Sequence, residues 1–430
     1  MRRKRIGILI SLVVIPLLLP IGLQAHVHYD LLDGGWLEVR DGVKILHVSG
    51  SYYEMGYQHG FLLKEEAHET QRAFLEYISE ISSYEQMLEI WNTVQPYVPS
   101  CYLEEMHGLA DGGQIPFETI AACYMTILFI DMQCFTYVAW NSATADGGLY
   151  HFRSLDFPLR IRDPMSGKYI QENSILIVRT PLDGVKSLLP SIAGAINFYQ
   201  GINANHIAIG VQVCWSSEET LRGIPVMFKT QRVLDVAENM QDAIEIFTGN
   251  NTLGWNFIVS DAKENTACAI EITANQSYTG TWDDPVEGNA PFWQIEEIVR
   301  RTNFFLHPEL ASTQRSTYDP SGINGFLRLF NNEPWFLVWR KYKSMSEEIE
   351  RQRRDINVTS GMSLMRKVYT GRTDVVMFLF IHLYKNSILC DFQQWGVCPQ
   401  TGEFVISFAD AKRYAHEAEL HHFNVYELFA

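Results

Sequence analysis

The hydrophobic period of the chain changes near residue 131, and this change constrains the fold more than any other feature. Before it, apolar residues recur at helical spacing over four stretches, 62–82, 84–95, 102–110 and 116–130. After it, two alternating runs at 134–140 and 149–155 are joined by Ala-Asp-Gly-Gly at 145–148, which predicts a β-hairpin. We therefore expect a helical N-terminal segment followed by a sheet-forming core.

The core is predicted to consist of largely antiparallel strands sandwiched by helices. Further strands are expected at 36–50 (a hairpin), 174–180, 186–190, 206–214, 255–261, 267–273, 386–392 and 403–408. Residues 225–248 carry apolar positions with charges between them, which predicts one amphipathic helix. From residue 292 onward the pattern is mostly helical, and 340–354 is expected to be a charged, solvent-facing surface. The fold class indicated is α+β.

The composition excludes several classes of function. The 430 residues are 47% hydrophobic, and 34 Lys and Arg against 50 Asp and Glu give a formal net charge of −16. An acidic surface repels phosphate backbones, so nucleic-acid binding is not expected. The sequence contains no HExxH, paired CxxC, EF-hand or glycine-rich phosphate loop pattern. Neither a metal nor a cofactor is therefore expected.

The first 25 residues form a segment of their own. Basic residues at positions 2–5 precede the apolar run 6–23, and Ala25 follows it. This order is typical of a secretory signal peptide cleaved after Ala25. The alternative is an uncleaved N-terminal membrane anchor. In either case, the rest of the chain is expected to be exported to a periplasmic, extracellular or luminal compartment.

Seven cysteines allow both disulfides and free thiols. Cys390 and Cys398 are close enough in sequence to be joined across a tight hairpin. Four others lie among apolar neighbours and are expected to be buried thiols: Cys101, Cys123, Cys214 and Cys268. The surroundings of the seventh, Cys134, indicate chemistry instead.

Cys134 begins the first strand of the predicted hairpin, and the returning strand carries Arg153 and Asp156. Because a returning strand lies beside the first one, Arg153 is expected to approach the cysteine. A guanidinium favours the thiolate, which is the nucleophilic form. Asp156 is expected to orient Arg153 or to hydrogen-bond a freed amine. The alternative is a buried cysteine beside an Arg–Asp pair that stabilises the hairpin end.

The hairpin resembles the nucleophile hairpin of penicillin acyltransferase-like proteins, the acyl-CoA:6-aminopenicillanic acid acyltransferase type of peptidase family C45. These are N-terminal nucleophile (Ntn) hydrolases. The shared pattern is a Cys, a strand, an Ala-Thr-x-Asp-Gly turn, and an Arg and an Asp on the returning strand. Further segments that resemble the family pattern follow in order at 50–60, 201–203, 223–225, 256–271 and 301–306. The matches span roughly residues 36–330.

The resemblance implies an αββα sandwich whose precursor cleaves its own Gln133–Cys134 peptide bond. Residues 26–133 would then be an N-terminal α chain or pro-segment, and 134–430 the catalytic core or β chain. The freed α-amine of Cys134 would act as base for its own thiol. This exchange costs little, since their reference pKa values are about 8 and about 8.5. The thiolate would attack an amide carbonyl and pass the acyl group to water or to an amine.

The resemblance also implies roles for individual residues. Cys134 would be the nucleophile, Arg153 and Asp156 the supporting pair, and Asn303 an oxyanion-stabilising amide. Asn303 is followed by Phe304 rather than by the His common in the family.

Other positions are implied less directly. Asn256 is a second candidate for lining the catalytic pocket, and the later Arg of the family corresponds to Arg315 or Arg328 as a substrate-binding residue. The usual Gly before the hairpin Arg is Phe152, and the usual Asn after it is Ser154. These departures concern the shape of the pocket.

The sequence thus predicts an exported, self-processing amidohydrolase or acyltransferase. Its expected partners are a small N-acyl amide substrate and, within the molecule, the two fragments of one precursor. Membrane contact is expected only through an uncleaved N-terminal anchor. Two alternatives are a relative of the same fold directed at esters or lipid amides, and a secreted protein that has the fold without turnover.

Overall fold

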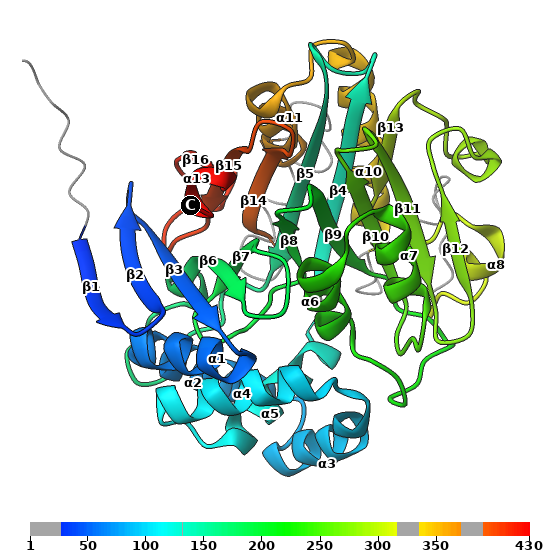
Figure 1. Cartoon of the computed structure of the whole chain (residues 1–430). Coiled ribbons are helices and arrows are strands. Elements are labelled where there is room, and N and C mark those ends of the chain that lie inside the picture. The colour runs from blue at the N-terminus through cyan, green and yellow to red at the C-terminus, as the bar shows by residue number, and fades with distance from the viewer. Residues whose placement is uncertain (1–26, 131, 316–334, 371–389) are drawn as a thin grey trace, which may run out of the picture.

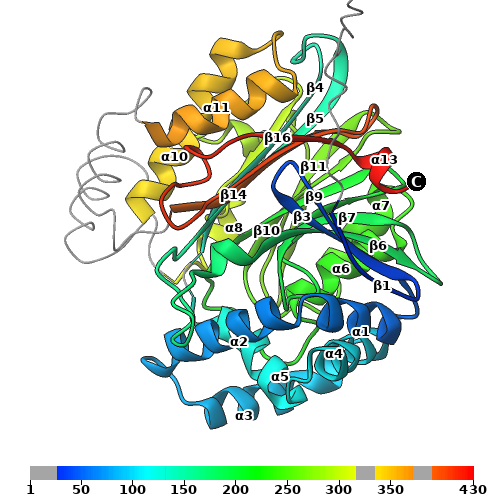
Figure 2. The same ribbon diagram turned by 90° about the vertical axis from the view of Figure 1, so that its left-hand side faces the viewer.

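Two β-sheets lie face to face at the centre of the molecule (Figures 1 and 2). The computed structural model describes residues 27–130, 132–315, 335–370 and 390–430. In these residues the larger sheet has ten strands, in the spatial order β1 (Val27–Leu32), β2 (Gly35–Arg40), β3 (Val43–Gly50), β6 (Ser174–Pro181), β7 (Ser187–Ile192), β8 (Gln200–Asn203), β9 (Ile207–Val213), β10 (Trp255–Asp261), β11 (Thr266–Ile272) and β12 (Ser277–Gly280). The smaller has β13 (Ile298–Arg301), β4 (Gln133–Asn141), β5 (Gly147–Phe157), β14 (Cys390–Cys398), β15 (Glu403–Phe408) and β16 (His421–Asn424).

The sheets bury their inner faces against each other, and helices cover their outer faces. Val138 and Trp140 of β4 share a buried cluster with Ile258 of β10 and Ala269 of β11. The outer helices are α6 (Val226–Val236) and α7 (Met240–Thr248) on the larger sheet, and α10 (Trp335–Gln352) and α11 (Val358–Thr370) on the smaller one. This order of layers is an αββα sandwich, so the predicted fold is confirmed.

The chain before Cys134 forms a further layer of helices at one end of the sandwich, seen at the bottom of Figure 2. These are α1 (Tyr52–Leu62), α2 (Lys64–Ser79), α3 (Tyr84–Val94), α4 (Ser100–Gly113) and α5 (Phe117–Met125). Helix α1 starts well before the predicted position 62, because Ser51 and Glu54 form a capping box there. Helix α4 ends at a pair of glycines, Gly112 and Gly113, after which Gln114 adopts a left-handed conformation.

The N-terminal segment also supplies strands to the core. The predicted hairpin at 36–50 is present as β2 and β3, which are joined by Asp41 and Gly42, both at positive φ. Strand β3 then pairs in parallel with β6, next to which β7 runs antiparallel. The residues before and after Cys134 are therefore combined in one sheet.

Two predictions about the elements are wrong. Residues 225–248 are two helices, because Ala237 is extended and Asn239 caps the second helix. The region after residue 292 contains helices, as predicted, and also the short strand β13, which pairs with β4. The expected solvent-facing surface at 340–354 instead buries four polar side chains, Lys341, Ser344, Ser346 and Glu348, because α10 packs against β4.

The predicted Cys390–Cys398 disulfide is also wrong. Both residues lie in β14, at its two ends, and all seven cysteines are free. Eight residues of extended strand separate them by about 26 Å, at roughly 3.3 Å per residue, far beyond disulfide reach. Residues 386–389 of the strand predicted at 386–392 lie outside the described residues. The rest of that predicted strand is the beginning of β14, which continues to Cys398. Of the four expected buried thiols, Cys101 is partly exposed and the others are buried.

Within the described ranges, no helix has both the length and the apolar character required to cross a membrane. The same part of the chain contains no group of three or more His, Cys, Asp or Glu side chains placed to hold a metal ion. The predicted signal peptide or anchor, residues 1–25, lies outside the described residues.

Candidate active site

Cys134 is the second residue of β4, and its side chain is 1% exposed between the two sheets. It lies opposite Leu155 of β5, while Thr136 lies opposite Arg153. Side chains at Cys134 and Thr136 share one face of the sheet with those of their partners. Arg153 consequently reaches the thiol diagonally, and its Nη2 donates to Cys134 Sγ over 3.5 Å. The predicted approach of Arg153 to Cys134 is confirmed.

The Arg153 guanidinium is fully buried between the sheets. It also donates hydrogen bonds to Gln200 Oε1 and, over 2.9 Å, to the carbonyl of Val211. Gly210 on β9 makes room for it, since a Cβ there would lie 2.5 Å from Thr136 Oγ1 and 3.1 Å from Arg153 Cδ. Burial lowers the pKa of Arg153 from its usual value. The result is a cation aimed at the thiol and oriented by neutral groups.

The thiol itself is in an environment that opposes ionisation. Burial raises the pKa of Cys134 to about 11, and the Arg153 charge only partly counteracts this. In the intact chain at neutral pH, Cys134 is therefore mostly a thiol. A nucleophilic role requires a nearby base or better access to solvent.

Asp156 lies on the other face of the smaller sheet. It pairs with Gln133, and an offset of three residues along β5 places its side chain on the opposite face from that of Arg153. Its carboxylate accepts hydrogen bonds from Lys341 Nζ and Tyr369 Oη. The expectation that Asp156 orients Arg153 is therefore not met. The carboxylate lies instead beside Gln133, the residue before Cys134.

Asn303 contacts the backbone of Cys134. The Cys134 backbone nitrogen donates to Asn303 Oδ1 over 2.7 Å. Asn303 Nδ2 donates to the carbonyl of Val213 over 2.8 Å and, less closely, to that of Met132 over 3.4 Å. The resemblance thus led to a residue that contacts Cys134, although 169 positions separate the two in sequence.

Asn256 contacts the backbone on both sides of Asn303. Its Nδ2 donates to the carbonyls of Thr302 and Phe304, over 3.0 and 2.7 Å. These carbonyls flank Asn303, so Asn256 holds the loop that carries it. The contacts of Asn256 are those of a positioning residue.

Arg315 is not brought to this site. Its side chain is 58% exposed, pairs with Glu219 and lies over the Trp215 ring at 5.5 Å. It stabilises a surface loop. The other candidate, Arg328, lies outside the described residues.

The two departures from the family pattern in β5 do not face the thiol. Phe152 points toward the helices, where it stacks on Tyr137 with ring centroids 4.7 Å apart. Ser154 Oγ lies 2.8 Å from Tyr369 Oη on the same face. Their side chains shape the packing behind the sheet rather than the space around Cys134.

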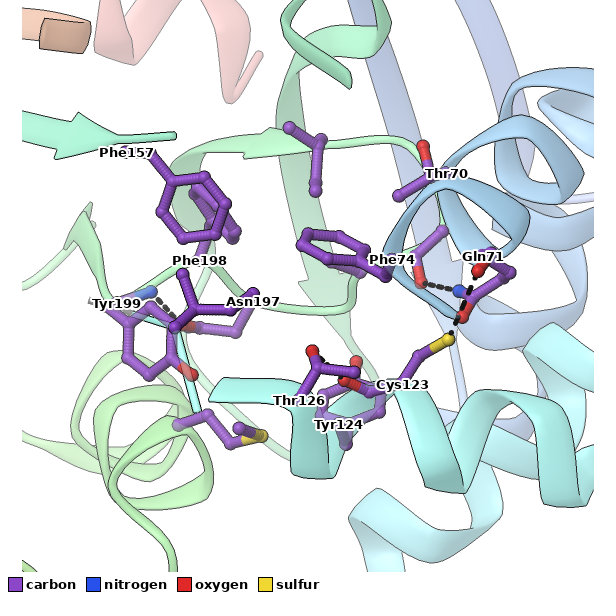
Figure 3. Close-up of a pocket in the computed structure, with 15 residues that line it drawn as sticks. Thr70, Gln71, Phe74, Cys123, Tyr124, Thr126, Phe157, Asn197, Phe198 and Tyr199 are labelled. Atoms are coloured by element: carbon purple, nitrogen blue, oxygen red, sulfur yellow. Dashed lines mark hydrogen bonds between the residues drawn. The ribbon is translucent and has the colours of Figure 1, made fainter. Parts of the chain in front are cut away.

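A small cavity with a mainly apolar lining lies next to this site (Figure 3). Figure 3 shows Phe157, Phe198 and Tyr199 on one side and Phe74 on the other. Tyr199 precedes Gln200, which binds Arg153. Some lining residues precede the Gln133–Cys134 bond in the sequence and others follow it. Because these residues are scattered over several elements, no periodic sequence pattern predicted this cavity.

A comparison with known families gives one match. Residues 171–323 match the model of the family described as acyl-coenzyme A:6-aminopenicillanic acid acyl-transferase. The matched stretch contains Asn256, Asn303 and Arg315, and it begins after β5. The resemblance predicted from the motifs is therefore confirmed over these residues, where the chain is similar to this family.

The chain is also similar, at low sequence identity, to curated proteins. The chain is 26% identical to protein dcd1B of Dictyostelium discoideum over 58% of this chain and 54% of that protein. It is 24% identical to an uncharacterized protein of Archaeoglobus fulgidus over 64% and 52%, respectively. These matches span about half the length of each relative. Protein dcd1A of D. discoideum is 25% identical over 86% of this chain and 84% of that protein.

Two solved structures are similar in part. One is a Caenorhabditis elegans ortholog of N-acylethanolamine-hydrolyzing acid amidase, 14% identical with a TM-score of 0.39, covering 68% of this chain and 99% of that one. The other is a mutant conjugated bile acid hydrolase of Clostridium perfringens, 13% identical with a TM-score of 0.31, covering 67% and 96%.

Proposed function

We propose, from the similarity to the acyltransferase family, that the protein is a cysteine-dependent amidohydrolase or acyltransferase. It would cleave its own chain between Gln133 and Cys134. It would then cleave or transfer the acyl group of an N-acyl amide. The observation that carries the proposal is the arrangement at Cys134: Arg153 donates to its sulfur, and Asn303 accepts from its backbone nitrogen. These contacts place a cation and an amide at the two atoms on which an N-terminal cysteine nucleophile depends.

The self-cleavage step begins with attack of Cys134 Sγ on the carbonyl carbon of Gln133. The bond between that carbon and the Cys134 nitrogen breaks, and the thiol proton ends on the nitrogen. Water then hydrolyses the thioester, which leaves a carboxylate on Gln133 and a free thiol and α-amine on Cys134. The new amine supplies the base that the buried thiol lacks in the intact chain.

In turnover, Arg153 would favour the thiolate and Asn303 would stabilise the oxyanion. Asn303 Nδ2 has one long hydrogen bond, the 3.4 Å contact with the carbonyl of Met132. Movement of the new chain end after cleavage would free that donor for a substrate oxygen. A fixed N–H donor aimed at a developing oxyanion contributes about 10²–10³-fold to the rate.

The neighbouring cavity supports an apolar acyl group. Phe74, Tyr124 and Ile130 line it from the chain before the cut, and Phe157 and Phe198 from the chain after it. The two fragments would therefore have to remain associated. The same apolar lining favours, as a second candidate, a lipid amide or an ester with a hydrocarbon chain.

The test is to follow the intact mass of purified protein with time. The expected result is a fragment that ends at Gln133 and one that starts at Cys134. Cys134→Ala should abolish the split and the turnover, whereas Cys134→Ser should slow or block the split. Cys268→Ala removes another buried thiol, on β11, and should be processed like the wild type.

The outcome decides between enzyme and binding protein. A chain that stays whole after prolonged incubation would indicate a protein that has the fold without turnover. If the split occurs, a panel of N-acyl amino acids, lactams, N-acyl lipids and esters separates the main proposal from the second candidate.

Export belongs to the same proposal and rests on residues 1–25 alone. N-terminal sequencing of protein from its own cell envelope or medium should begin after Ala25. Recovery of Met1 in a membrane fraction would indicate the uncleaved anchor instead.

A further inference from the structure

Lys341 contacts both the residue before the nucleophile and the carboxylate opposite it. It lies on α10 and is 3% exposed, although it belongs to a run of charged residues. Its Nζ donates to Asp156 Oδ2 and, over 3.1 Å, to the side-chain oxygen of Gln133. It also lies 5.3 Å from the centroid of the Tyr369 ring. A buried ammonium is tolerated only with such partners.

Lys341 belongs to a buried network of charged and polar groups on the helix-covered face of the smaller sheet. Asp156 receives Lys341 on one oxygen and Tyr369 on the other. Burial raises the pKa of Asp156, and the Lys341 charge opposes that rise. The facing groups on β14 and beyond are Asp391 and His416, which pair with each other over 2.7 Å. Lys341 thus gives one ammonium hydrogen bond to Asp156 and another to Gln133.

Asn303 holds the backbone around the Gln133–Cys134 peptide bond, on the face of the sheet opposite Lys341. Asn303 accepts from the Cys134 nitrogen and donates to the Met132 carbonyl. Its contacts are with backbone atoms on either side of Gln133, whereas Lys341 holds the Gln133 side chain. Together they restrain the residue whose carbonyl carbon must meet the cysteine sulfur.

We propose that Lys341 is a positioning residue for cleavage of the Gln133–Cys134 bond. It acts by holding the Gln133 side chain, which keeps the Gln133 carbonyl within reach of Cys134 Sγ. The inference rests on the proposed self-cleavage and concerns that step more than turnover. After the split, Gln133 is a chain end, while the ion pair between Lys341 and Asp156 remains.

The experiment measures the rate of the split in full-length chains. Gln133→Leu removes the acceptor and leaves the Lys341–Asp156 pair in place. Lys341→Met removes the donor. Each is expected to slow the split about tenfold or more, the effect of losing a hydrogen bond to a charged group. The double variant should be no slower than the slower single variant, since both remove one contact.

A matched control is Lys343→Met on the same helix. Lys343 is 45% exposed and forms an ion pair along the helix with Glu347. It should split at the wild-type rate. Thermal unfolding of each variant in a Cys134→Ala background compares the folds without processing.

Turnover of the fraction that has been processed, per titrated thiol, should change less than twofold in Gln133→Leu. Wild-type rates of splitting in both Gln133→Leu and Lys341→Met would overturn the assignment. So would additive slowing in the double variant, which indicates two independent effects. A wild-type chain that never splits would instead refute the proposed function itself.

Discussion

The Cys134 backbone nitrogen donates to Asn303 Oδ1 over 2.7 Å, which ties the start of β4 to the loop that follows β13, the neighbouring strand in the smaller sheet. The contact depends on a second asparagine, because Asn256 binds the two carbonyls that flank Asn303. Asn303 thus contacts Cys134 directly, whereas Asn256 contacts the backbone on both sides of Asn303.

The first prediction distinguishes these two asparagines. Asn303→Leu removes the acceptor for the Cys134 nitrogen and the proposed oxyanion donor. We expect kcat of processed enzyme to fall about 100-fold or more, with a smaller change in KM. Asn256→Leu should lower the free energy of unfolding, because two buried carbonyls lose their donor, and should reduce kcat less than Asn303→Leu. An unchanged kcat in Asn303→Leu would remove that residue from catalysis.

A second prediction concerns the pH dependence of self-cleavage. The pKa of Cys134 in the intact chain is raised to about 11 by burial, against the opposing charge of Arg153. Below that value, the thiolate fraction grows tenfold per pH unit. The rate of the split, followed by intact mass, should therefore rise about tenfold per unit from pH 7 to 9. It should not depend on protein concentration, since the attack is within one chain. A flat profile would indicate that thiol deprotonation does not limit the split.

A third prediction tests the packing of the N-terminal helices with two adjacent glycines. A Cβ on Gly112 would lie 2.1 Å from the carbonyl oxygen of Tyr57, on α1. A Cβ on Gly113 would meet the Ile115 side chain at 3.2 Å and the Gly60 backbone only at 3.7 Å, an ordinary van der Waals contact. Gly112→Ala should lower the free energy of unfolding by at least about 2 kcal/mol, because backbone has to move. Gly113→Ala should cost little or stabilise, since Ala favours helix. Equal effects in urea unfolding would contradict the contact.

Local patterns predicted the hairpin and the contact it creates. Cys134 and Arg153 meet because strand alternation and a short turn determine which residues share a face. The same parity argument applies to Asp156, three residues from Arg153, and would have placed it on the opposite face. Asn303 was reached only through the resemblance, since no local rule links residues that far apart.

Other errors came from tertiary context that no local pattern contains. Lys341 lies in a run of charges that is typical of a solvent-exposed helix, but its partners come from β4 and β5. Cys390 and Cys398 have hairpin-like spacing, yet the strand between them does not turn. The residues lining the cavity become neighbours only when the N-terminal helices pack against the core.

The last prediction uses His59, a buried side chain in the helical layer. Its Nε2 accepts a hydrogen bond from the backbone nitrogen of Gly194 over 2.9 Å, so the folded protein requires the neutral ring. Burial, with a smaller contribution from Arg179, lowers the pKa of His59 to about 3. Because the folded value lies below the unfolded value of about 6.5, the unfolded chain binds more protons between these values.

Stability from His59 is thus present above about pH 6.5 and is lost as the pH falls toward 3. Between pH 7.5 and 5 this residue alone should cost about 2 kcal/mol of unfolding free energy. His59→Gln retains an acceptor oxygen for Gly194 but does not titrate, so its loss over that interval should be smaller by that amount. Urea unfolding in a Cys134→Ala background, which keeps the chain whole, measures both. Comparison at pH 7.5 and 9, where His59 is neutral in both states, serves as the control. An equal loss of stability on acidification in both proteins would show that His59 is not held neutral by the fold.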